Sequence, residues 1–225
     1  MPGRKKKIFT DGVYHVFNKS INSTAIFDSD YNCSLFLNII RYYRSGKARV
    51  SFSHLKYISS ELRQHILLQT QIEEHFRVKL LAYCLMPTHY HLLLAQLEDN
   101  GVSKFISNVT NSFTRHLNVK NERLGPLFLT KFKAVPILTD EQLIHISRYI
   151  HLNPYSSNIV RDIEELEIYP WSSYRQYISG IQGLCVTKPV MKLFNHKLQR
   201  YKNFITQRAD YQKTLEFAKH AEKWI

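Results

Sequence analysis

Residues 77–96 decide the fold, and they read RVKLLAYCLMPTHYHLLLAQ. The first part, 77–86, is rich in apolar and branched residues and predicts a strand that ends before Pro87. Residues 89–96 are mostly apolar and predict a second strand after a break of only two residues. Strands joined by so short a connection pair as antiparallel neighbours. We therefore expect an antiparallel sheet that extends outward from this hairpin.

Further strands and helices are expected on both sides of the hairpin. Alternation over 12–18 predicts a strand, and residues 127–137 are extended in character. Apolar residues at helical spacing predict helices over about 28–43 and 102–124, and residues 59–76 are interpreted as a polar helix. A fourth helix is expected to begin at the cap residue Thr139 and to be ended by Pro154. The first of the four helices is capped by Asp28 or Ser29. A short strand is possible between Gly46 and the second helix.

This order of elements is that of an α+β layer, an antiparallel sheet with helices on one face. A ferredoxin-like (RRM-like) arrangement is the one we expect, although the pattern alone does not single it out. Residues 1–180 are expected to form the main domain and 181–225 a basic helical extension. From Lys188 to the end there are nine Lys or Arg residues against three acids.

The composition favours a polyanionic partner. The chain has 225 residues, 44% of them hydrophobic, and 31 Lys and Arg against 18 acidic residues give a formal net charge of +13. Such a surplus points to nucleic acid or an anionic membrane surface, although a basic protein without such a partner stays possible. No apolar run is long enough to cross a bilayer, and no apolar signal region follows the basic first residues. Three scattered cysteines fit reduced thiols, so a cytoplasmic location is expected.

Two histidines form a candidate metal site. His89 and His91 are two residues apart on a predicted strand, so their side chains face the same way while Tyr90 faces the other. Two adjacent imidazoles provide half of a metal site. The alternative is that one is a hydrogen-bonded core residue and the other is incidental, because a chain with 11 histidines contains such pairs by chance.

A tyrosine on the fourth predicted helix is a candidate nucleophile. Tyr149 and Asn153 lie four residues apart and share one edge of that helix. Leu143, Ile146 and Ile150 form a neighbouring apolar stripe that would pack on the sheet, which leaves the Tyr149 hydroxyl able to reach a site there. From this segment alone an ordinary tyrosine at the core boundary is the better reading. His151 points about 200° away from Tyr149 around the helix, which disfavours a metal role for it.

Taken together, four motifs in register resemble the REP-associated tyrosine transposases, within the HUH single-tyrosine transposases of single-stranded DNA. They are Leu-Met-Pro followed by His-Tyr-His (85–91), Gly-Pro-Leu-Phe…Phe-Lys-Ala (125–134), Arg-Tyr-Ile-His-Leu-Asn-Pro (148–154) and Tyr-Pro-Trp-Ser-Ser-Tyr (169–174). The resemblance runs from about Tyr14 to Tyr177. Thr88 stands where Asn is commoner, and Tyr90 is bulkier than the usual Val or Phe.

The resemblance implies a metal-dependent DNA endonuclease and transposase. It makes Tyr149 the nucleophile that forms a 5′-phosphotyrosine, and His89, His91 and Asn153 the ligands of Mg²⁺ or Mn²⁺. The expected partner is single-stranded, hairpin-bearing DNA, bound by a monomer or a homodimer, with no membrane contact. The segment 45–75 is longer than the corresponding segment of the shorter family members, and the sequence assigns it no role.

Basic residues are the candidates for phosphate contact. Between Lys104 and Lys133 there are six Lys or Arg residues against one acid. The expected DNA-binding residues are Arg4, Lys5, Lys6, Arg115, Arg123, Lys131 and Lys133, although a solvated surface and a frayed terminus are the plain alternatives. Two other functions stay open: a non-cutting protein that binds structured single-stranded nucleic acid, and a Zn²⁺ hydrolase in which Tyr149 is dispensable.

Overall fold

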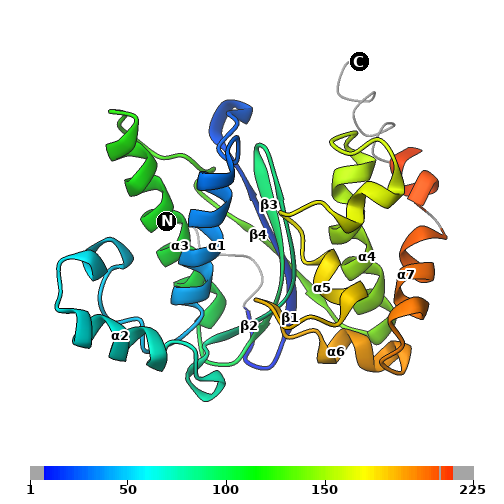
Figure 1. Cartoon of the computed structure of the whole chain (residues 1–225), viewed down its shortest axis with the longest axis horizontal. Coiled ribbons are helices and arrows are strands. Elements are labelled where there is room, and N and C mark those ends of the chain that lie inside the picture. The colour runs from blue at the N-terminus through cyan, green and yellow to red at the C-terminus, as the bar shows by residue number, and fades with distance from the viewer. Residues whose placement is uncertain (1–7, 208, 215–225) are drawn as a thin grey trace. The chain divides into compact units, whose positions relative to one another are not determined.

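The computed structural model describes residues 8–207 and 209–214 of the chain (Figure 1). The strands are β1 (Val13–Lys19), β2 (Val78–Met86), β3 (His89–Gln96) and β4 (Lys133–Ile137). The α-helices are α1 (Asp30–Tyr43), α2 (Ser60–Gln69), α3 (Gly101–Lys120), α4 (Asp140–Ser156), α5 (Tyr174–Ser179), α6 (Lys188–Met191) and α7 (Leu198–Thr206). Short 3₁₀ turns are η1 (Ile21–Ser23), η2 (Phe52–Lys56), η3 (Glu73–His75), η4 (Ile163–Glu167) and η5 (Lys192–Phe194).

The sheet confirms the predicted fold class. Its strands are hydrogen-bonded in the order β2-β3-β1-β4, and along the chain they alternate with helices as β1-α1-β2-β3-α3-β4. Backbone bonds from Gln96 to Gly12 (2.9 Å) and from Ser20 to Thr88 (2.8 Å) join opposite ends of β1 and β3, so these two strands are antiparallel. This is the ferredoxin-like α+β arrangement.

The chain forms two compact units. The first contains residues 1–79, 87–89 and 94–136, and the second contains 80–86, 90–93 and 137–225. The division passes through β2 and β3, and it groups α4 to α7 together. The boundary expected near residue 180 stays a prediction.

In the first unit, α1 and α3 pack against each other (Figure 1). Helix α1 begins where predicted, because the Ser29 side chain accepts a hydrogen bond from the Asn32 amide. Between the helices lies an aromatic cluster in which Phe36 meets Phe27 and Phe113 at ring-centroid distances of 4.9 and 5.0 Å. Phe128 joins the same cluster and is buried.

The start of α3 requires glycine. A Cβ on Gly101 would lie 2.5 Å from the Arg77 carbonyl oxygen, closer than real contacts allow. Asn100 just before it has φ of +60°, a left-handed conformation that Asn tolerates. The Gln96 side chain then accepts from the Val102 amide at 3.0 Å and satisfies one of the first donors of the helix.

Residues 45–75 contain no strand beyond an isolated bridge between Ser45 and Phe76, so the possible short strand there was wrong. They form η2, α2 and η3 instead, so the helix expected over 59–76 ends at Gln69. The segment is tied down where it leaves α1: the Tyr42 hydroxyl donates to the Val50 carbonyl at 2.7 Å, and the Tyr43 hydroxyl accepts from the Phe52 amide at 3.0 Å. These bonds fix the path of an irregular segment that has little periodic sequence signal.

Two other predicted boundaries also needed correction. Helix α4 continues past Pro154 to Ser156, because proline keeps a helical φ and removes only one backbone donor, so near a helix end it need not stop the helix. Strand β4 covers only 133–137, although the Leu129 amide also bonds to the Lys19 carbonyl at 2.9 Å. The extended segment is therefore two short paired pieces.

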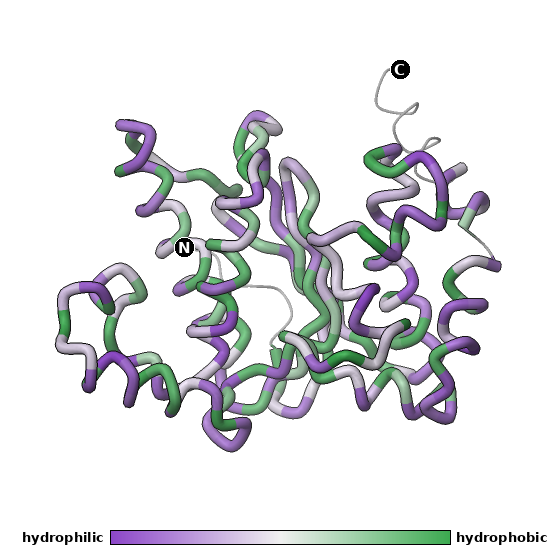
Figure 2. The backbone as a smooth tube through the Cα atoms, viewed as in Figure 1, coloured by the Kyte–Doolittle hydropathy of each residue, from purple (hydrophilic) through white to green (hydrophobic). Residues whose placement is uncertain are grey.

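The second unit packs its helices around the middle of the hairpin strands. Figure 2 shows hydrophobic residues running along β2 and β3, in accord with their burial. Contacts with β2 are made by backbone and hydroxyl groups: the Leu85 amide donates to the Trp171 carbonyl, and the Tyr177 hydroxyl donates to the Leu81 carbonyl, both at 2.8 Å. No helix within 8–207 and 209–214 is long and apolar enough to span a membrane.

Candidate active site

Strand β3 presents the two predicted histidines as the period of a strand requires. His91 is 5% exposed and His89 is partly exposed, whereas Tyr90 between them is fully buried. The Thr88 hydroxyl lies 3.0 Å from Nδ1 of His89. A partner on one ring nitrogen fixes the orientation and tautomer of an imidazole, as the residues behind metal-binding histidines do. The Thr88 hydroxyl is thus placed where it can orient the His89 ring.

Helix α4 brings Tyr149 against His91. The two rings are 5.5 Å apart between centroids and meet edge to face at 88°. Both residues belong to the second unit, and they are separated by 58 positions in the sequence (149 − 91). Tyr149 is partly exposed, beside the buried Ile150. The predicted closeness of the nucleophile candidate and one histidine of the pair is therefore present in the structure.

Asn153 lies one helical turn after Tyr149 and is 3% exposed. Its Nδ2 donates to the Tyr149 carbonyl at 2.8 Å, and the Gln212 side chain donates to the same oxygen at 3.2 Å. With the amide nitrogen held in this way, Oδ1 is the atom through which Asn153 would bind a metal.

The predicted metal ligands are His89, His91 and Asn153, whose donor groups are two imidazoles and an amide and carry no negative charge. Among the described residues there is no group of three or more His, Cys, Asp and Glu side chains that could hold a metal ion. By residue type, two imidazoles and one amide oxygen are nevertheless the mixed nitrogen and oxygen donors that divalent ions accept. The donor types therefore fit a divalent ion, without the negative charge that a carboxylate ligand would supply.

The predicted DNA-binding residues differ in their surroundings. Arg115, Lys131 and Lys133 are exposed, as phosphate contact requires. The Arg123 guanidinium donates to Asn118 Oδ1 at 2.8 Å and to the Pro126 carbonyl at 3.1 Å, so it also braces the loop after α3. Arg4, Lys5 and Lys6 lie outside the described residues, and their proposed role stays a prediction.

Sequence reasoning missed the polar cluster on another side of α4. His151 is fully buried, with Nδ1 at 2.7 Å from the Tyr201 hydroxyl and Nε2 at 2.7 Å from the Ser173 hydroxyl. Burial lowers the pKa of His151 to about 3, so the ring is neutral at ordinary pH. The burial and partners of His151 make a structural role the better reading, and the expectation that it faces away from Tyr149 is compatible with this placement.

Three comparisons relate this chain to known proteins. The family model described as "Transposase IS200 like" matches residues 44–153, a span that includes His89, His91, Tyr149 and Asn153. A putative REP-associated tyrosine transposase of Haemophilus influenzae is 25% identical over 134 residues, which cover 55% of this chain and 74% of that protein.

One solved structure supports the fold, and a second was also matched. A REP-associated tyrosine transposase bound to a REP hairpin has a TM-score of 0.54 at 13% identity, over 82% of this chain and 90% of that one. A putative transposase from Deinococcus radiodurans R1 has a TM-score of 0.36 at 14% identity, over 67% of this chain and 95% of that one. The first of these structures shares the ferredoxin-like arrangement described above.

Proposed function

We propose that this chain is a single-stranded DNA transposase related to the REP-associated tyrosine transposases, and that it cuts and rejoins DNA through Tyr149. The observation that carries the proposal is the placement of the Tyr149 ring against His91, a residue of the predicted metal-binding pair. An isolated tyrosine or an isolated histidine pair would each have an ordinary structural explanation. Their association supports a common site.

In the proposed reaction, the Tyr149 oxygen attacks a backbone phosphate and the 3′ oxygen leaves. The products are a 5′-phosphotyrosine and a free 3′-hydroxyl, with the phenol proton passing to solvent or to the leaving oxygen. The new phosphodiester replaces the one that is broken, so a 3′-hydroxyl can later attack it and rejoin the strand without ATP. Hydrolysis of the phosphotyrosine bond would prevent this rejoining.

The histidines and Asn153 are proposed to hold a divalent ion, Mg²⁺ or Mn²⁺. When bound, such an ion offsets the negative charge of the phosphate and favours the phenolate, since an ordinary phenol is protonated at neutral pH. The chain's own contribution is positional. Thr88 orients the His89 ring, and the backbone of α4 sets Tyr149 and Asn153 one turn apart.

The proposed partner is hairpin-bearing single-stranded DNA. A relative of the same fold is bound to a REP hairpin, and the net charge of this chain is +13. Exposed Arg115, Lys131 and Lys133 are proposed phosphate contacts. The acting species is a monomer or a homodimer.

The test is covalent capture. The full chain is incubated with labelled hairpin-bearing single-stranded DNA and Mn²⁺, and denaturing electrophoresis then detects a DNA–protein adduct. We expect an adduct with the natural chain and none with Tyr149→Phe. Tyr155→Phe is the matched control, because this tyrosine is on the same helix and its hydroxyl bonds to Asp210 instead.

The other outcomes are equally informative. Cleavage that persists in Tyr149→Phe would overturn the nucleophile assignment and favour a metal-dependent hydrolase. Specific binding without cleavage in Mg²⁺, Mn²⁺ or Zn²⁺ would favour a non-cutting nucleic-acid-binding protein.

A further inference from the structure

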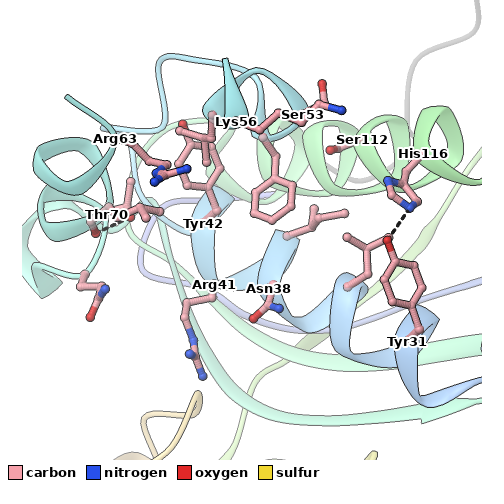
Figure 3. Close-up of a pocket in the computed structure, with 16 residues that line it drawn as sticks. Tyr31, Asn38, Arg41, Tyr42, Ser53, Lys56, Arg63, Thr70, Ser112 and His116 are labelled. Carbon is pink, nitrogen blue, oxygen red and sulfur yellow. Dashed lines mark hydrogen bonds between the residues drawn. The ribbon is translucent and has the colours of Figure 1, made fainter. Parts of the chain in front are cut away.

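A groove in the first unit lies between α1, residues 51–71 and α3 (Figure 3). It consists of two hollows of about 510 and 670 Å³. They are continuous, since both are lined by Tyr31, Ser53, Lys56, Ser112 and His116. Each is of the size that binds small organic ligands. The segment to which the sequence assigned no role thus forms one wall of both hollows.

The charge of the groove has a single sign. No acidic residue lines either hollow. Five exposed cationic side chains do: Arg41, Lys56, Arg63, Arg115 and Lys120. Within 8–207 and 209–214, none of the five forms a salt bridge. The acidic residues Asp30 and Glu61 belong to α1 and α2, but neither lines a hollow. Such a groove is complementary to a polyanion.

Aromatic rings accompany these charges. Tyr57 is 71% exposed, with the Lys56 Nζ 4.7 Å from its ring centroid, and Tyr31 is 53% exposed, with the Lys120 Nζ at 4.5 Å. Phe52 lines the smaller hollow and meets Tyr42 edge to face at 5.7 Å. Aromatic faces beside cationic groups are what unpaired bases and their phosphates require together.

His116 lines both hollows, and the direction of its pKa shift reflects its burial and the positive charge of the groove. Burial lowers its pKa, and Lys120 and Lys56 lower it further. Its Nε2 lies 3.0 Å from the Tyr31 hydroxyl, as Figure 3 shows. Two lysines in the groove therefore act on a third residue of the lining, which is consistent with the one-sided charge.

Hydrogen bonds within the chain hold the groove wall in place. The bonds of Tyr42 to Val50 and of Phe52 to Tyr43 hold the approach to η2, and the Ser59 side chain caps α2 by accepting from the Leu62 amide at 3.3 Å. A preformed wall lowers the entropy cost of binding.

We propose that this groove binds unpaired nucleotides of single-stranded DNA, with the phosphates on Lys56, Arg63 and Arg115 and a base against Tyr57 or Tyr31. A duplex presents its bases stacked and paired, so it would use the charges but not the rings. An apolar protein surface would use the rings but leave five cations without counter-charges. The combination favours a flexible single strand.

This inference rests on the DNA-binding part of the proposed function and not on strand cutting. We therefore test it in the Tyr149→Phe background, where cutting plays no part. Fluorescence anisotropy compares two labelled DNAs, a hairpin without flanks and the same hairpin with a single-stranded tail. The variants are Lys56→Gln/Arg63→Gln and Tyr57→Ala, and Lys192→Gln removes a charge from an exposed position outside the groove as the control.

We expect the tail to increase affinity, and both groove variants to remove most of that gain. Tyr57→Ala should lower the affinity for tailed DNA by roughly tenfold, which is the effect of losing one stacked base. The double variant should lower the slope of log K against log salt by about 1.4, because each single-strand phosphate contact contributes about 0.7. Lys192→Gln and the binding of the hairpin without flanks should change little.

Unchanged affinity for tailed DNA in both groove variants would overturn the inference, even if the covalent adduct forms normally in the natural chain. Equal weakening of tailed and untailed hairpins would also overturn it, because the groove would then be a general phosphate surface. Loss of the adduct with retained groove effects would instead contradict only the proposed cutting function.

Discussion

Helix α4 contributes one residue to each of two histidine–tyrosine pairs, and the two pairs differ in burial. Tyr149 meets His91 edge to face and keeps partial exposure. His151, two residues later, is fully enclosed and lies 2.7 Å from the hydroxyl of Tyr201, which is itself fully buried. The Tyr201 hydroxyl also donates to Ser147 at 3.2 Å. The same two side-chain types thus occur in an accessible setting and in a closed one.

This difference shows how burial decides what such a pair can do. Burial lowers the pKa of His151 to about 3 and raises the pKa of Tyr201, so the ring stays neutral and the phenol stays protonated. No reactant can approach either group. The enclosed pair therefore contributes stability, whereas in the other pair Tyr149 keeps the partial exposure that the proposed reaction needs.

The largest expected effect separates the two pairs by activity. His91→Ala or His89→Ala should reduce adduct formation by about 1,000-fold, because a bound metal contributes several kcal/mol of charge stabilisation. DNA affinity should stay within about threefold, since Lys and Arg contacts to phosphate dominate it. Adduct yield and anisotropy are measured side by side. His65→Ala, an exposed histidine on α2, is the control. Parallel loss of affinity would make the pair structural.

The next effect concerns stability. His151→Ala should lower the free energy of unfolding by about 3 kcal/mol, because it leaves a cavity and removes a partner from both Tyr201 and Ser173. His145→Ala on the same helix, at a half-exposed position, should cost below about 1 kcal/mol. Urea denaturation gives both values. Similar costs for the two variants would contradict the structural role of His151.

A smaller effect is expected in the pH dependence. Folded His151 binds no proton until about pH 3, whereas the unfolded chain binds one below about pH 6.5. Stability from this burial is thus present above pH 6.5 and lost as the pH falls. Between about pH 6 and 4, His151→Gln should show a slope smaller by about 1.4 kcal/mol per pH unit. Buried His15, whose pKa is lowered to about 4, contributes equally to both proteins and cancels.

The smallest effect is at the start of the shared helix. The Thr139 side chain accepts from the Gln142 amide at 3.1 Å, so Thr139→Ala should lower stability by about 1 kcal/mol. Adduct formation should stay within about twofold, because Tyr149 lies nearly three turns further along. Thermal unfolding and the adduct assay measure the two effects. A large loss of adduct would mean that the helix start also positions the tyrosine.

Much of the fold was accessible from local patterns. The hairpin at 77–96, the Ser29 cap of α1 and the apolar stripe of α3 all occur as predicted, because strand and helix periods are properties of neighbouring residues. The predicted end of α4 was wrong by two residues, since only packing decides whether a proline near the end of a helix terminates that helix. The short strand expected in 45–75 was wrong because that segment is fixed by side-chain bonds to Tyr42 and Tyr43.

The sequence by itself determined which residue types are available and how each is spaced on its own strand or helix, including the shared face of His89 and His91 and the one-turn separation of Tyr149 and Asn153. Only the tertiary structure decided that Tyr149 meets His91, that His151 is enclosed and that five cations surround one groove. The physical reason is range. Periodicity acts within a few residues, whereas burial, pKa and the sign of a surface depend on side chains brought together from distant parts of the chain.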